Sequence, residues 1–80
     1  MKILDVNTIV KKDNNVIKRS SKYFNTDEPL TVDHIKNVIK GELGLPFEIV
    51  KEEFYYMDKI LKDTDTAPFK SGNELILTVK

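Results

Sequence analysis

The sequence predicts a small α+β domain in which one helix packs across a mixed sheet, with its elements in the order β-β-α-β-β-β. Helical periodicity is confined to residues 31–43. Segments rich in β-branched and aromatic residues lie on both sides of that stretch, and clusters of Asn, Asp, Gly and Pro separate them. A chain of 80 residues supports one hydrophobic core, so we expect a single domain covering residues 1–80.

The first two predicted strands form a hairpin. Residues 2–10, KILDVNTIV, are rich in β-branched side chains and partly alternate between apolar and polar. Residues 12–15 are a turn cluster, because Asp and Asn tolerate left-handed backbone conformations. In the second strand, residues 16–24, Val16 and Ile17 place apolar groups on both faces, as do Tyr23 and Phe24. This irregular alternation predicts a β-bulge or a strong twist.

The single helix follows a loop over residues 25–29 and begins after Thr31, a favourable N-cap residue. Its apolar side chains recur at helical spacing: Val32, Ile35, Val38, Ile39 and Leu43. Gly44 can adopt the left-handed conformation that ends a helix. Pro46 then disfavours helical geometry at Leu45, so the helix cannot continue.

Three further strands are predicted after the helix. Residues 50–56 suit a strand, 57–58 a tight turn and 59–61 a short return strand. Residues 62–71 form a long polar connection in which Phe69 is the apolar anchor. After a turn at 71–73, residues 74–79 alternate regularly between polar and apolar, which indicates a final strand.

The composition favours an intracellular globular protein, cytoplasmic or nuclear. Hydrophobic residues make up 40% of the chain and charged residues 32%, which is typical of a folded domain rather than a disordered tail. Asp5 and Asn7 interrupt the first apolar stretch, so it is a poor signal peptide. There is no cysteine, and hence no disulfide framework, thiol nucleophile or cysteine-based metal site.

The net charge is zero, but the two ends of the sequence differ in sign. Residues up to Asn25 carry six basic and two acidic side chains, whereas the remainder carries seven lysines and eleven acidic residues. The basic residues of the hairpin are Lys11, Lys12, Lys18, Arg19 and Lys22. Either they decorate a solvated face, or they form a surface that docks on acidic lipid or nucleic acid.

The segment TVDHIKNVIKGELGLP, residues 31–46, resembles the helix of ubiquitin and the glycine-hydrophobe-proline sequence that ends it. FYYMDKILKD resembles the strand-turn-strand that carries ubiquitin's binding patch, and NELILTV resembles its last strand. The chain thus resembles the ubiquitin-like family, which implies a β-grasp fold. The resemblance also implies that Val32, Ile35 and Ile39 face the sheet, and that Lys36 forms an ion pair with Asp63.

The chain departs from ubiquitin in three ways. The hairpin is longer, the connection before the last strand is shorter, and the sequence ends at Lys80 without the flexible tail and terminal Gly-Gly that conjugation requires. We therefore expect an interaction domain that is not attached to other proteins through its C-terminus. A modifier whose Gly-Gly tail follows Lys80 in the gene is the alternative.

The resemblance places partner-binding residues on one face of the sheet: Tyr55 and Thr78, with Lys59 at the rim. Strand alternation puts Ile76 beside them on the same face. Alternation within EFYYM supports the role of Tyr55, because it turns away from the face that takes Phe54 and Tyr56. An exposed aromatic ring beside an aliphatic strand can anchor a partner peptide or helix. Tyr55 can equally pack across strands against Ile76 without binding anything.

The sequence contains no motif that indicates an enzyme. It has no nucleophile elbow, phosphate-binding loop or metal-ligand pattern, and its single histidine, His34, has no suitably spaced companion ligand. Glu52 and Glu53 are adjacent in a predicted strand, so they point to opposite faces and cannot share a substrate. We expect a monomeric, non-catalytic protein-binding domain that needs no cofactor and no metal.

Overall fold

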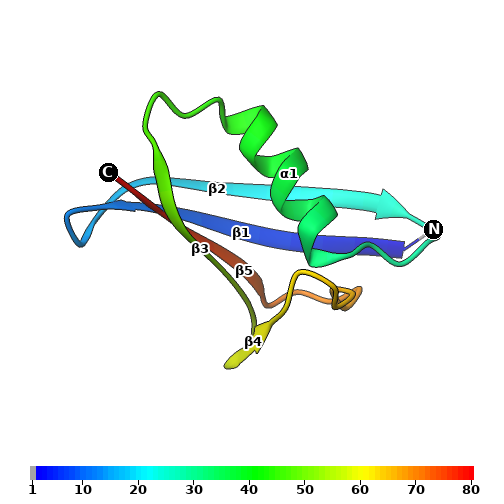
Figure 1. Cartoon of the computed structure of the whole chain (residues 1–80). Helices are drawn as coiled ribbons and strands as arrows, with labels where there is room; N and C mark the ends of the chain where they lie inside the picture. Colours follow the sequence, from blue (N-terminus) through cyan, green and yellow to red (C-terminus); the bar gives the residue numbers. More distant parts are fainter. Residues whose placement is uncertain (1) are drawn as a thin grey trace.

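The computed structural model describes residues 2–80, which form one helix and a five-stranded mixed sheet (Figure 1). The strands are β1 (Lys2–Lys12), β2 (Asn15–Thr26), β3 (Ile49–Tyr56), β4 (Lys59–Leu61) and β5 (Asn73–Val79), and the helix is α1 (Val32–Leu43). The chain therefore has the predicted α+β class and the predicted order of elements. No helix within these residues is long and apolar enough to cross a membrane.

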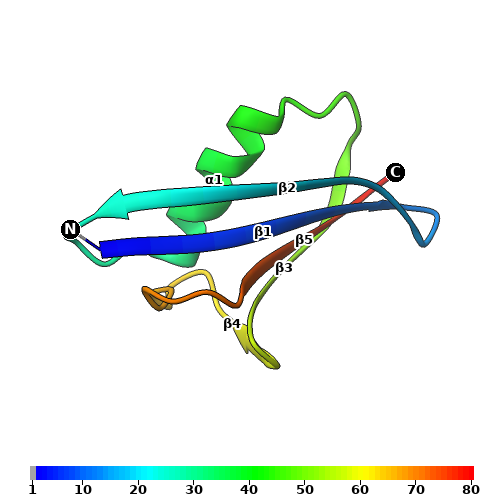
Figure 2. The same cartoon turned by 180° about the vertical axis from the view of Figure 1, so that it is seen from behind.

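The strand order across the sheet is β2-β1-β5-β3-β4. The two central strands, β1 and β5, run parallel, while all other neighbours run antiparallel. Helix α1 crosses one face of the sheet, as the two opposite views show (Figures 1 and 2). No element within residues 2–80 covers the other face, which we call the open face.

The hairpin of β1 and β2 is longer than the sequence predicts, because the strands stay paired up to a two-residue turn. Asp13 and Asn14 have φ values of 52° and 65°, the left-handed pair that matches the twist of two antiparallel strands. The predicted bulge is confirmed: Val10 pairs with Lys18 and Lys11 with Val16, which leaves Ile17 without a partner in the ladder. A second irregularity leaves Val50 unpaired in β3.

Both predicted helix ends are confirmed. The Thr31 side chain accepts a hydrogen bond from the backbone N–H of His34 at 3.2 Å, as an N-cap should. Gly44 has a φ of 53° and donates its N–H to the carbonyl of Lys40 at 3.1 Å, which closes the last turn. The chain is then free to turn back toward β3.

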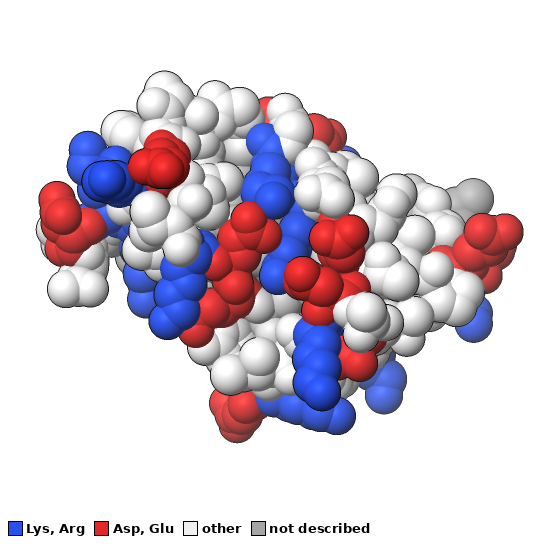
Figure 3. All heavy atoms as spheres, in the orientation of Figure 1, with Lys and Arg blue, Asp and Glu red and all other residues white. Residues whose placement is uncertain are grey.

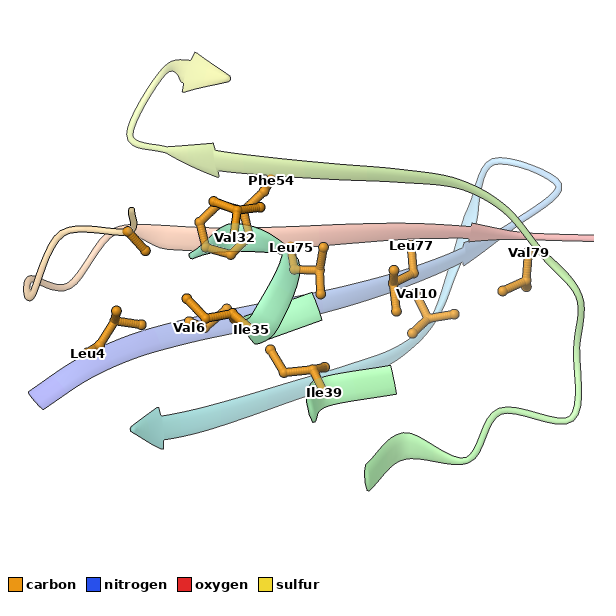
Figure 4. Close-up of a cluster of buried hydrophobic side chains, with 11 residues drawn as sticks. Leu4, Val6, Val10, Val32, Ile35, Ile39, Phe54, Leu75, Leu77 and Val79 are labelled. Atoms are coloured by element: carbon orange, nitrogen blue, oxygen red, sulfur yellow. The ribbon is translucent and has the colours of Figure 1, made fainter. Parts of the chain in front are cut away.

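The hydrophobic core lies between α1 and the sheet (Figure 4). It consists of alternate residues of β1 and β5, the inward side of α1 and one aromatic ring of β3: Leu4, Val6, Val10, Leu75, Leu77, Val79, Val32, Ile35, Ile39 and Phe54. Val32, Ile35 and Ile39 thus face the sheet as expected. The core also takes in Ala67, which the sequence left in the polar connection.

The connection between β4 and β5 is held against the start of the helix. The N–H of Val32 donates to the carbonyl of Asp65 at 2.9 Å, and that of Ala67 to the carbonyl of Leu30 at 3.0 Å. Phe69 packs against the core, which confirms its predicted role as an anchor. The fully buried side chain of Asn73 donates to the carbonyls of Pro68 and Lys70, so this long segment is ordered by its backbone contacts.

Candidate functional site

Two isoleucines lie side by side at the centre of the open face. Ile9 of β1 pairs with Ile76 of β5, and both are only half-buried, whereas their neighbours along each strand are buried on the helix side. Alternation along β5 places Thr78 on the open face as well, since Leu75, Leu77 and Val79 take the core positions.

Tyr55 lies on the same open face, next to these central strands. It pairs with Glu74 of β5 on one side and with Ile60 of β4 on the other. Its face follows from the core position of Phe54, one residue earlier. The structure therefore places three of the predicted binding residues, Tyr55, Ile76 and Thr78, on one surface. Tyr55 itself is half-buried rather than fully exposed.

The hydroxyl group of Tyr55 is hydrogen-bonded to a neighbouring carboxylate. Tyr55 donates a hydrogen bond to Glu53 Oε2 at 2.8 Å, along the same face of β3. This hydrogen bond, with desolvation and the nearby charges of Glu53 and Glu74, raises the pKa of the Tyr55 phenol above its usual value. The hydrogen bond links Tyr55 to Glu53, the β3 residue that pairs with Ile76.

Lys59 lies apart from the other predicted binding residues. It pairs with Tyr56, whereas Ile60 pairs with Tyr55, so alternation turns the Lys59 side chain to the helix side of the sheet. The exposed neighbour of Tyr55 is instead Ile60, with 63% of its surface accessible. An aliphatic side chain therefore stands where the resemblance to ubiquitin implied a lysine.

Sequence reasoning missed Ile9 and Ile60 as members of this surface. Ile60 was detectable, because strand alternation sets it apart from Lys59 and Leu61 and beside Tyr55. Ile9 carries no such local signal. It joins the surface only because β1 pairs in parallel with β5, a contact between the two ends of the chain.

The predicted basic residues of the hairpin are divided between the two faces of the sheet. Arg19 pairs with Ile9 and Lys11 with Thr78, which places both on the open face. The others lie on the helix side, where they pair with core positions: Lys12, Lys18 and Lys22. Lys22 forms an ion pair with Glu42 of α1 at 2.9 Å, so it is engaged within the domain.

A separate cluster of charges joins the helix to the sheet. The predicted ion pair is present: Lys36 lies 2.6 Å from Asp63, although only 7% of the lysine is exposed. Lys40 contacts Glu52 of β3 at 2.9 Å. Glu52 faces the helix while Glu53 faces away, which confirms that the two carboxylates do not share a site. These contacts fasten α1 to the sheet and are structural.

Among residues 2–80, no three or more side chains of His, Cys, Asp or Glu are grouped to hold a metal ion. One open hollow includes Ile9, and its lining residues are Asn7, Thr8, Ile9, Arg19, Ser20, Ser21 and Glu74. Such a surface suits contact with a macromolecule more than enclosure of a small substrate.

Comparison with protein-family models, curated proteins and solved structures finds no match for this chain.

Proposed function

We propose that the chain is a ubiquitin-like β-grasp domain that acts as a non-catalytic protein-binding module and uses its open face to hold a partner peptide or helix. One observation carries this proposal: an uncovered sheet face has the apolar pair of Ile9 and Ile76 at its centre. The order of elements and the TVDHIKNVIKGELGLP segment support the assignment to the β-grasp.

The chemistry around the isoleucine pair suits a partner with an apolar stripe. Tyr55 and Ile60 extend the apolar surface on the β3 side, and Thr78 borders it. Arg19 on one flank and Glu53 on the other offer polar contacts at the rim. An apolar centre with a charged rim is the usual anatomy of a protein-binding surface.

Peptides selected from a displayed random library on the immobilised domain would test this proposal. We expect the amides that shift in the NMR spectrum on peptide binding to lie around Ile9, Tyr55 and Ile76. Tyr55→Ala or Ile76→Ser should weaken binding about tenfold or more, because each removes buried contact at the centre. Tyr23→Ala is the matched control, since Tyr23 is exposed on the same face but lies on the edge strand β2.

Two results would contradict the proposal. One is a set of shifts that maps to the helix or to the hairpin turn instead of the open face. The other is unchanged peptide affinity in folded Tyr55→Ala and Ile76→Ser proteins, with folding checked by circular dichroism.

A further inference from the structure

One end of the molecule combines exposed aliphatic side chains with basic residues. We call it the hairpin end and define it as residues 11–19, at the turn between β1 and β2, with residues 47–51, at the start of β3. The register of the sheet places these segments at the same end, because Lys11 pairs with both Val16 and Thr78, and Thr78 pairs with Lys51. Figure 2 shows this hairpin turn projecting past the helix.

Three aliphatic side chains of this end are exposed, and two of them lie where the strands are irregular. Val16 is 42% exposed, Ile17 45% and Val50 57%. Ile17 and Val50 are the unpaired residues of the two irregularities in the sheet, where an inserted residue breaks the regular alternation of faces. Phe47 adds an exposed ring, with Lys12 Nζ 4.6 Å from its centre. None of these four side chains belongs to the buried core.

Basic residues outnumber acidic ones around these side chains, and Figure 3 shows charges of both signs on the helix side of this end. Six basic residues belong to or border the hairpin end: Lys11, Lys12, Lys18, Arg19, Lys51 and Lys80. The acidic residues there are Asp13 in the turn and Glu48, and Lys51 also lies 3.8 Å from Glu53. Lys80 lies 3.9 Å from Glu48, but both side chains are largely exposed, so that pair is weak.

We propose that the hairpin end docks on an anionic lipid bilayer, with the exposed aliphatic residues entering the interface and the basic residues meeting the lipid headgroups. Apolar side chains surrounded by lysines match the layered chemistry of such a surface. A second copy of the chain would bring like charges together. Nucleic acid would contact the basic residues but would leave the apolar side chains of Val16, Ile17 and Val50 without a binding role. In addition, five of the six basic residues are lysines, which lack the bidentate phosphate contact of arginine.

Sedimentation with vesicles tests this proposal. We expect binding to phosphatidylcholine vesicles that contain phosphatidylserine, weaker binding as salt rises, and little binding to phosphatidylcholine alone. Val16→Thr with Ile17→Thr should weaken binding about tenfold, because β-branching and strand propensity are kept while apolar contact is lost. Ile60→Thr changes an aliphatic side chain elsewhere that is more exposed still, at 63%, and should leave vesicle binding unchanged.

Charge variants supply a second, independent readout. Lys18→Gln with Arg19→Gln should weaken vesicle binding about 25-fold, since each cation near an anionic surface contributes about fivefold. Lys59→Gln with Lys62→Gln removes the same charge elsewhere and should have a much smaller effect. Asp13→Asn should strengthen binding, because it removes the carboxylate in the turn.

Absence of vesicle binding at low salt would overturn the proposal, as would full binding by the folded Val16→Thr, Ile17→Thr protein. Binding of a duplex oligonucleotide without vesicle binding would assign the basic residues to nucleic acid instead. Tyr55→Ala should leave vesicle binding intact. The proposals of vesicle binding by the hairpin end and of peptide binding by the open face can therefore be tested separately.

Discussion

At the scale of single residues, Tyr55 and its neighbours show how position in a strand decides the role of a side chain. Tyr55 follows Phe54 directly, yet the first helps to form the candidate binding surface and the second fills the core. Lys59 and Ile60 are also adjacent and differ in the same way. The Lys59 side chain turns to the helix side of the sheet, whereas Ile60 lies beside Tyr55 on the open face. A shift of one residue in register would reverse both assignments.

The Tyr55 hydroxyl yields a pH prediction. Because the hydrogen bond to Glu53 favours the protonated phenol, the pKa of Tyr55 is raised in the folded protein. This contribution to stability is fully present below the ordinary tyrosine pKa of about 10 and is lost as pH rises through the folded value. In a Tyr23→Phe, Tyr56→Phe background, ultraviolet titration should show Tyr55 ionising above its usual range. Glu53→Gln should lower that pKa, and an unchanged titration curve would mean that Glu53 is not its cause.

At the scale of the element, the two ends of α1 follow directly from local chemistry. Thr31 caps the first turn and Gly44 ends the last one, and Pro46 keeps the chain from resuming the helix. The GELGLP segment therefore acts as the corner between α1 and β3. Gly41 and Gly44 lie three residues apart, but only the second has a left-handed backbone.

These two glycines should respond to alanine in opposite directions. Gly41 lies inside α1 with no atom within 4 Å of an added Cβ, so Gly41→Ala should stabilise the protein by about 0.5–1 kcal/mol. At Gly44, with its φ of 53°, alanine should cost about 1–2 kcal/mol. Urea denaturation of both variants measures the two changes. Effects of the same sign would show that the helix does not end where the structure places its cap.

At the scale of the whole molecule, one helix and one face of the sheet form the core, and the other face is left free. This division follows from the strand order, in which the first and last strands pair at the centre. Ile35 lies at the end of the first turn of α1 and is fully buried against the sheet, while Ile60 is mostly exposed on the open face.

The two isoleucines test this division. Ile35→Ala should lower the free energy of unfolding by about 2–5 kcal/mol, because it leaves a cavity between helix and sheet. Ile60→Ala should change it by less than about 0.5 kcal/mol, as surface substitutions do. Thermal or urea unfolding gives both values. A surface-like effect at Ile35 would contradict the packing of α1 across the sheet.

The sequence by itself determined the elements that depend on local chemistry. Thr31, Gly44 and Pro46 determine where the helix begins and ends, and Asp13 and Asn14 determine the hairpin turn. The apolar side chains of the adjacent residues Val16 and Ile17 predicted the β-bulge. Each of these signals acts over a few residues, where backbone sterics and capping hydrogen bonds dominate.

Only the tertiary structure decided which residues meet at the two candidate surfaces. Ile9 reaches Ile76 through the parallel pairing of the first and last strands. Val50 lies at the same end of the sheet as the hairpin turn because of the register of β3 on β5 and of β5 on β1. The division of the hairpin's basic residues between two faces follows instead from strand alternation, since Lys18 and Arg19 are adjacent in β2. The pairing of distant strands is determined by burial of the whole core. A local sequence pattern therefore does not predict which side chains this pairing places next to one another.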